Sequence, residues 1–229
     1  MIRTSFRSTL VAVVTAVAAT AVAPLAYAQS EQQKLVGSAE TTFSNFVRDP
    51  DMKWIQQNLG RAKAVLIAPE IVKAGFILGG SGGRAVLVAR DAKSGKWVGP
   101  AFYTLATGSI GFQAGVEVSE AVTLVMTEKG MNSLLASSFK MGADASVAAG
   151  PVGAGAKSDI VADLVTFSRS KGVYGGLNLD GTVVKTSDEW NSAFYGKPVL
   201  PPDILVRMSV QAKGAEKLLA DVAKAAGGK

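Results

Sequence analysis

Apolar residues near the start of the chain recur at helical spacing. Steps of four, four and three place one set of them on a single helix face, with charged and amide residues on the other faces. This set is Leu35, Ala39, Phe43 and Phe46. A second, shorter helix is predicted after it, because Asp49 is a favourable N-cap residue and Pro50 suits the first helical position.

From about residue 63 the pattern changes to short apolar or alternating runs broken by glycines. Such runs are typical of β-strands, and they cover residues 64–68, 76–78, 85–89, 97–105 and 116–126. The turn residues from Asp91 to Gly95 indicate that the third and fourth of these runs form a hairpin. Asp180-Gly181 predicts a second hairpin, between residues 173–179 and 182–186.

Two further helices complete the predicted elements. One covers residues 128–137, and the other lies near residues 212–226, after a loop that contains three prolines. Helices at both ends with strands between them predict an α+β fold. We expect a single domain with an antiparallel β-sheet or barrel-like core and helices at the N- and C-terminal ends. Residues 29–60 are assigned to the N-terminal helices, and residues 61–229 to the main domain with its C-terminal helix.

The first 28 residues have the features of a cleaved secretory signal peptide. Arg3 and Arg7 precede an uncharged apolar run over residues 10–23, and Ala26-Tyr27-Ala28 follows as an A-x-A cleavage site. The run has 14 residues, whereas a membrane-spanning helix needs about 20, so an uncleaved anchor is the less favoured alternative. We therefore expect export, cleavage after Ala28 and a periplasmic mature chain, in solution or peripheral to a membrane.

The composition excludes several kinds of chemistry. The sequence contains no cysteine and no histidine, which excludes thiol nucleophiles, Ser-His-Asp triads and zinc sites built from these residues. Removing 28 residues from 229 leaves 201, enough for one domain with a substantial core. The net charge then falls from +6 to +4, a mild excess that does not indicate nucleic-acid binding. We expect no catalytic activity, no cofactor and no metal.

Two short motifs imitate enzyme signatures. Residues 80–85 match the dinucleotide-binding pattern G-x-G-x-x-A, but an alternating run follows where that fingerprint needs a helix, so a glycine-rich hairpin is favoured. Ser137 and Lys140 match S-x-x-K, and Lys185-Thr186-Ser187 is close to the K-T-G element of penicillin-binding enzymes. The S-D-N element that should lie between them is absent, which favours a chance match.

Glycine-punctuated segments recur between residues 62 and 196. They are AGFI (74–77) with GG (79–80), GKW (95–97) with PAF (100–102), SIGFQAG (109–115), GADA (142–145) with AGPVG (149–153), SRSKGVYGG (168–176), and Asn191 with FYG (194–196). Their order and spacing resemble the SYLF domain, a lipid-binding module also named after a yeast actin-binding protein. The resemblance covers about 140 of the 201 residues that follow the signal. The glycine-rich stretch 79–84 departs from eukaryotic members, which usually carry a bulkier, more basic turn.

The resemblance implies binding to acidic phospholipids, with phosphoinositides in eukaryotic members and actin bundling in some fungal ones. Lipid phosphates are met by cationic side chains and turn amides, beside aromatic rings that enter the interface. The candidate residues at the first hairpin are Arg84, Arg90, Lys93, Lys96 and Trp97. Arg169 and Lys171 flank another glycine turn and form a second, weaker candidate. Alternatively, these charges are solvated turn residues and Trp97 belongs to the core.

Two functions from different classes remain open. The first is an exported lipid-binding module that binds anionic phospholipid headgroups or a membrane surface through the basic-aromatic hairpin. The second is a periplasmic protein-interaction or envelope-structural domain without catalytic activity, whose partner is an envelope protein. Neither involves nucleic acid, and an enzyme is disfavoured by the missing residue types.

Overall fold

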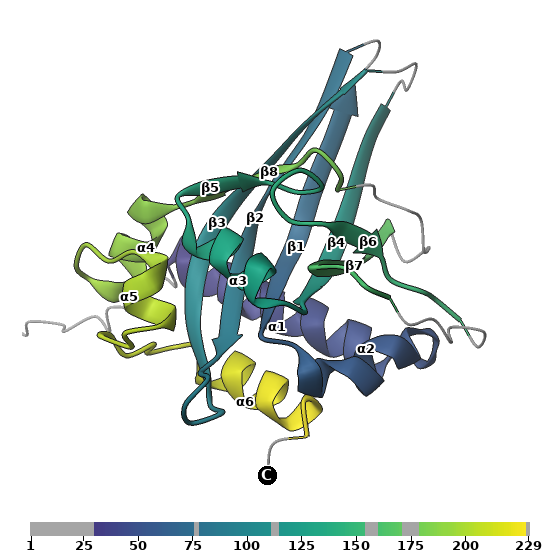
Figure 1. The fold of residues 1–229 in the computed structure, drawn as a ribbon. Coiled ribbons are helices and arrows are strands. Elements are labelled where there is room, and N and C mark those ends of the chain that lie inside the picture. Colours follow the sequence, from purple (N-terminus) through teal and green to yellow (C-terminus); the bar gives the residue numbers. More distant parts are fainter. Residues whose placement is uncertain (1–29, 76–77, 111–114, 154–159, 171–178, 228–229) are drawn as a thin grey trace, which may run out of the picture.

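The computed structural model of the 229-residue chain describes residues 30–75, 78–110, 115–153, 160–170 and 179–227. These residues form one α+β domain in which an eight-stranded sheet curls into a half-barrel (Figure 1). Helices from the N- and C-terminal regions pack on it, as the sequence predicts. In Figure 1 the four central strands continue upward beyond the helices.

The sheet has the strand order β5-β8-β3-β2-β1-β4-β7-β6. Every neighbouring pair is antiparallel except β6 and β7, which run parallel. The strands are β1 (Ala64–Gly75), β2 (Leu78–Arg90), β3 (Trp97–Ile110), β4 (Gly115–Val125), β5 (Ser138–Lys140), β6 (Val147–Ala149), β7 (Leu164–Ser170) and β8 (Val183–Thr186). The predicted β2–β3 hairpin is confirmed. The first arm predicted for the hairpin at Asp180-Gly181 lies mostly outside the described residues.

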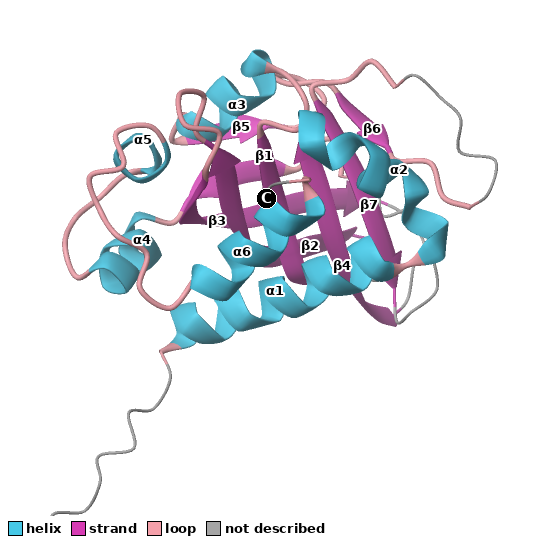
Figure 2. Cartoon of the chain, turned by 90° about the horizontal axis from the view of Figure 1, so that it is seen from below, coloured by secondary structure: helices cyan, strands magenta, loops and turns pink. Residues whose placement is uncertain are grey.

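The helices lie on both faces of this sheet. They are α1 (Glu31–Arg48), α2 (Lys53–Asn58), α3 (Glu128–Leu135), α4 (Asp188–Tyr195), α5 (Pro201–Leu205) and α6 (Glu216–Ala225), with short 3₁₀ turns η1 (Pro50–Met52) and η2 (Leu59–Arg61) flanking α2. Figure 2 shows α1 and α6 side by side across one face. Two of the three prolines expected in a loop, Pro201 and Pro202, instead begin α5, because proline is tolerated at the first helical positions.

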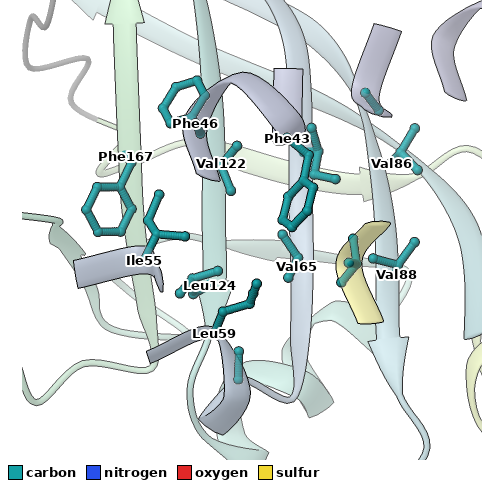
Figure 3. Close-up of a cluster of buried hydrophobic side chains, with 14 of the residues drawn as sticks. Phe43, Phe46, Ile55, Leu59, Val65, Val86, Val88, Val122, Leu124 and Phe167 are labelled. Carbon is teal, nitrogen blue, oxygen red and sulfur yellow. The ribbon is translucent and has the colours of Figure 1, made fainter. Parts of the chain in front are cut away.

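The larger core lies between α1, α2, α6 and the sheet. Phe43 and Phe46 of α1 are fully buried against Val65, Val122 and strand neighbours (Figure 3). Helix α1 begins after Ser30, whose hydroxyl accepts a hydrogen bond from the backbone N–H of Gln33 at 3.2 Å. Its apolar positions recur at helical spacing because only one face of α1 meets the sheet.

A second core covers the opposite face of the sheet. Alternate residues of the same strands, such as Leu66 and Leu87, point away from α1 and meet Leu134 of α3 and Ile204 of α5. Successive side chains in a strand point to opposite faces, so burial on both faces produces a continuous apolar run. This accounts for the run at residues 64–68.

The glycine-rich stretch 79–84 lies inside β2, where it forms one arm of the β1–β2 hairpin. The register of β1 shifts between Ile67 and Glu70, which is a β-bulge. A Cβ atom added to Gly83 would lie 2.3 Å from the carbonyl oxygen of Glu70, so the bulge requires glycine there. The stretch has no helix after it, which excludes a dinucleotide site of the type that its motif imitates.

Asp163 connects α3 to the strands β6 and β7. One carboxylate oxygen accepts a hydrogen bond from Thr127 Oγ1 at 2.5 Å, and the other accepts bonds from the N–H and Oγ of Ser146 at 2.9 and 2.8 Å. Thr127 is also the N-cap of α3. These donors, with Thr127 first, favour the ionised carboxylate and hold the pKa of Asp163 below its usual value.

We expect Asp163→Asn to reduce the acid sensitivity of the fold. Because the pKa of Asp163 is lower in the folded than in the unfolded chain, its contribution is present above about pH 4 and is lost as the pH falls further. Urea unfolding between pH 6 and pH 3 should show a smaller loss of stability in the variant than in the wild type. Asp51→Asn, at an exposed position, is the control, and an unchanged pH dependence in Asp163→Asn would contradict this role.

Candidate functional site

The turn between β2 and β3 presents basic side chains to solvent. Asp91 begins it and accepts hydrogen bonds from the Oγ and N–H of Ser94 at 2.5 and 2.8 Å. The Ser94 hydroxyl, followed by its N–H, holds the pKa of Asp91 below its usual value. Gly95 has a φ of 70°, which side-chain-bearing residues rarely adopt. The turn is therefore fixed, and Lys93 and Lys96 are exposed on it.

This turn forms one wall of a hollow of about 960 Å³, which we call the basic groove. Its other walls come from η2, the two residues that lead into β1, α3, and the end of α5 with the three residues after it. The cations that line it are Arg61, Lys63, Arg90, Lys93 and Arg207. Only two acidic residues, Asp91 and Glu128, share the described lining, so the groove carries a positive excess. Its volume is typical of small-molecule sites.

Internal contacts position four of these five cations, and the weakest is the bond from Arg61 Nη1 to the amide oxygen of Asn58 at 3.3 Å. Arg90 donates from Nη1 to the carbonyl oxygen of Gly60 at 2.8 Å, which ties the turn to η2. Lys63 Nζ lies 2.5 Å from Glu128 Oε1, and Arg207 Nη1 lies 2.5 Å from Asp203 Oδ1. Among the described residues, the charged groups of Arg61 and Lys93 form no ion pair. Both remain available to an anionic ligand.

Apolar side chains are exposed beside these charges. Val206 and Met208, on either side of Arg207, are 53% and 44% exposed and also line the groove. The backbone φ of Met208 is 50°, which is unusual for any residue other than glycine. Residues held in such conformations concentrate at ligand sites. The groove thus combines cations with exposed, apolar side chains.

Arg84 is separate from this groove. It lies six residues before Arg90 along β2, or about 20 Å at the rise of a strand. Its guanidinium carbon is 3.9 Å from the centroid of the Trp190 ring, a cation–π contact. Both residues line another hollow of about 1170 Å³ between α1 and the sheet, where Glu31 and Glu70 balance Lys34 and Arg84.

Trp97 and Lys96 differ in environment although they are adjacent. Trp97 begins β3, is only 8% exposed and belongs to the core that faces α1. Most of its side chain is therefore covered, and Trp97 belongs to the core, which is the alternative interpretation that the sequence left open. Lys96 is exposed but lies outside the lining of the basic groove.

Arg169 links α1 to the sheet through its side-chain contacts. It lies in β7 rather than in a turn, and its side chain is 17% exposed. Its guanidinium donates to Glu120, lies 4.0 Å from the Asp49 carboxylate and is 5.0 Å from the centroid of the Phe46 ring. Two carboxylates thus already neutralise its charge. Lys171 lies outside the described residues.

The enzyme-like motifs form no site in the structure. Ser138–Lys140 is the strand β5, whereas S-x-x-K chemistry requires a helix to bring both side chains to one face. The described residues contain no group of three or more acidic residues that could hold a metal ion. None of the helices in these ranges is long and apolar enough to cross a membrane.

Sequence reasoning located the turn but missed the other walls of the basic groove. The missed residues are Arg61, Lys63, Val206, Arg207 and Met208. They come from two segments that are far apart in the sequence, so no local pattern joins them. The available signal was the run Val206-Arg207-Met208, in which two apolar residues flank a cation without helical or strand periodicity.

The chain is similar to proteins of a known family. A family model described as "Las17-binding protein actin regulator" (Ysc84) matches residues 106–226. "LAS seventeen-binding protein 3" of Saccharomyces cerevisiae is 34% identical over 145 residues, which cover 60% of this chain and 31% of that protein. "SH3 domain-containing YSC84-like protein 1" of Homo sapiens is 28% identical over 165 residues, which cover 70% of this chain and 48% of that protein.

The matches thus span about a third to a half of the length of these relatives. The family model alone covers more than half of the present chain, from the outer part of β3 through α6. The residues matched by the family model include Arg207 and its wall of the basic groove. The turn that carries Lys93 lies before the first matched residue. The chain therefore belongs to the Ysc84 family, whose domain is the SYLF domain.

Proposed function

We propose that the protein binds anionic phospholipid headgroups, or an anionic membrane surface, through the basic groove. The observation that carries this proposal is the convergence of five cations with the exposed side chains of Val206 and Met208 around one hollow. Headgroup phosphates meet the cations while the apolar side chains enter the interface. Each basic residue near an anionic membrane surface contributes about 1 kcal/mol.

The proposal differs from the sequence hypothesis in its residues. Arg90 and Lys93 are kept, and Lys96 extends the positive surface along the same turn. Arg61, Lys63 and Arg207 are added from the other walls of the groove. Arg84, Trp97 and Arg169 are left out of the headgroup site because each is engaged in another part of the structure.

We place this activity in the periplasm, on the basis of the signal-like first 28 residues. The lipid is then one that a bacterial envelope presents to that compartment. N-terminal sequencing of the protein from a periplasmic extract should give Gln29 as the first residue. Full-length protein retained in the inner membrane would contradict this location.

Co-sedimentation with vesicles tests the binding itself. The mature protein should sediment with vesicles that contain phosphatidylglycerol, increasingly with the anionic fraction, and should not sediment with pure phosphatidylcholine. Binding should weaken as salt rises from 50 to 500 mM, because exposed charges are screened over about 8 Å at physiological ionic strength. Equal binding to both kinds of vesicle, or none to either, would overturn the proposal.

A protein partner is the second candidate function. The matched family is described as Las17-binding and actin-regulating, and the yeast relative is named for binding LAS seventeen. The corresponding role here is an envelope protein that contacts the same domain, without catalysis. A specific partner recovered by cross-linking, together with no vesicle binding, would favour this role over the first.

A further inference from the structure

A small apolar pocket lies beside the basic groove. Its volume is about 120 Å³, and it is lined by the start of β3, by α4, α5 and α6, and by the segment that leads into α6. The lining includes Trp97, Val98, Ile204, Val210, Ala212 and Leu219. The one phenol in the lining, that of Tyr195, donates its hydrogen bond to the carbonyl oxygen of Pro100 at 2.8 Å. Apart from this phenol and the indole N–H of Trp97, the side chains that line the pocket are apolar.

Met208 separates this pocket from the basic groove and lines both. Its left-handed backbone is held by hydrogen bonds on either side. The N–H of Arg207 donates to Pro202 and the N–H of Ser209 donates to Asp203, each at 2.9 Å to the carbonyl oxygen. The backbone is thus fixed, while the methionine side chain is flexible enough to let a ligand pass.

We propose that the pocket holds part of the alkyl chain of an anionic amphiphile whose headgroup lies in the basic groove. This inference rests on the function proposed above and deepens it, because it makes the ligand one lipid molecule rather than only a charged surface. An apolar cavity of about 150 Å³ can hold a benzene molecule, so this pocket accepts a short stretch of chain and not a whole one. A chain entering it passes Met208 and reaches the ring of Trp97.

Quenching of Trp97 fluorescence tests this placement. The probe is octyl phosphate brominated near the end of its chain, used below its micellar concentration, because bromine quenches an indole ring that it contacts. We expect saturable quenching that Trp97→Phe largely removes. Ala212→Phe, which fills the pocket, should weaken it about tenfold or more, and Lys93→Glu should weaken it by removing a headgroup contact.

A chain-length series on the unmodified protein gives a second measurement that no folding defect can affect. From ethyl to dodecyl phosphate, affinity should rise about fourfold per methylene until the pocket is full, and should then level off. An affinity that rises steadily to dodecyl phosphate, or quenching that survives Ala212→Phe, would overturn the inference. Vesicle binding without quenching overturns the pocket alone, whereas the absence of both overturns the proposed function as well.

Discussion

Replacing Arg61 and Lys93 together by glutamate should weaken binding to phosphatidylglycerol vesicles about a thousandfold at low salt. The two side chains lie on different walls of the basic groove, and neither forms an ion pair among the described residues. The variant removes two attractions of about 1 kcal/mol each and adds two repulsions of similar size. The sum of about 4 kcal/mol corresponds to the stated factor. Vesicle titration with a range of lipid concentrations measures it.

The control is the double variant Lys53→Glu with Lys185→Glu. It changes the net charge by the same amount, but Lys53 begins α2 and Lys185 lies on β8, and neither lines the groove. We expect it to retain most of the binding. Thermal melts of both double variants should match the wild type, because exposed charges contribute little to stability. Equal losses in the two variants would mean that total charge matters and the groove does not.

The terminal helices could be predicted because each buries a single face. In α1 the buried residues Ala39, Phe43 and Phe46 keep helical spacing, and in α6 Leu218 and Val222 do the same. The sequence predicts that α3 ends at residue 137, whereas it ends at Leu135 in the structure. The difference arises because Ala136 and Ser137 carry no signal that ends a helix.

The positions of the long strands could be predicted from the sequence, but their lengths could not. Their inner halves are buried on both faces and form apolar runs, whereas the outer halves of β2 and β3 are rich in glycine and hydroxyl residues. In β2 the outer half includes residues 79–83, Gly-Gly-Ser-Gly-Gly, a composition typical of a turn. Pairing with β1 and β3 supplies the ladder that makes it a strand. Tertiary pairing of this kind has no signal within the segment itself.

The candidate site also has a part that the local sequence predicts and a part that depends on the tertiary fold. Arg90 and Lys93 belong to one hairpin, so a local pattern placed them together, and they line one groove. Arg84 belongs to the same hairpin arm, but the extended backbone carries it away from the turn. Arg207 follows α5, a five-residue helix that opens with two prolines and was expected to be a loop. A wall built on such an element could not be placed before the fold was known.

Asn191 of α4 should be among the most sensitive positions of the fold. Its side chain is fully buried, and its Oδ1 accepts a hydrogen bond from the backbone N–H of Phe102 in β3 at 2.9 Å. The nearby strand β8 pairs with β3 only from Tyr103 onward, so Asn191 supplies the acceptor that a neighbouring strand would otherwise offer. One of the motifs that carry the family resemblance includes Asn191. In the structure, its side chain provides the hydrogen-bond acceptor for the backbone N–H of Phe102.

Asn191→Ala should lower the free energy of unfolding by about 2–4 kcal/mol. The substitution leaves the Phe102 N–H buried without an acceptor, which costs about 1–3 kcal/mol, and the lost side-chain volume adds a cavity cost. The Phe102 carbonyl keeps its bond from the N–H of Ser187 at 2.9 Å, so one group is orphaned rather than two. Urea unfolding followed by circular dichroism measures the change. Asn132→Ala, at an exposed position on α3, should change stability by less than about 0.5 kcal/mol.

Asn191→Asp separates the hydrogen bond from the volume of the side chain. It retains an acceptor for the Phe102 N–H at nearly the same size but introduces a carboxyl group into a fully buried site. Burial raises the pKa of that carboxyl above the value of about 3.9 in the unfolded chain, so the destabilisation should be greatest at neutral pH and should diminish as the pH falls toward 4. Asn191→Ala should show no such recovery relative to the wild type. Wild-type stability in both variants would contradict the role of Asn191 in the fold, because it would mean that another group satisfies the Phe102 N–H.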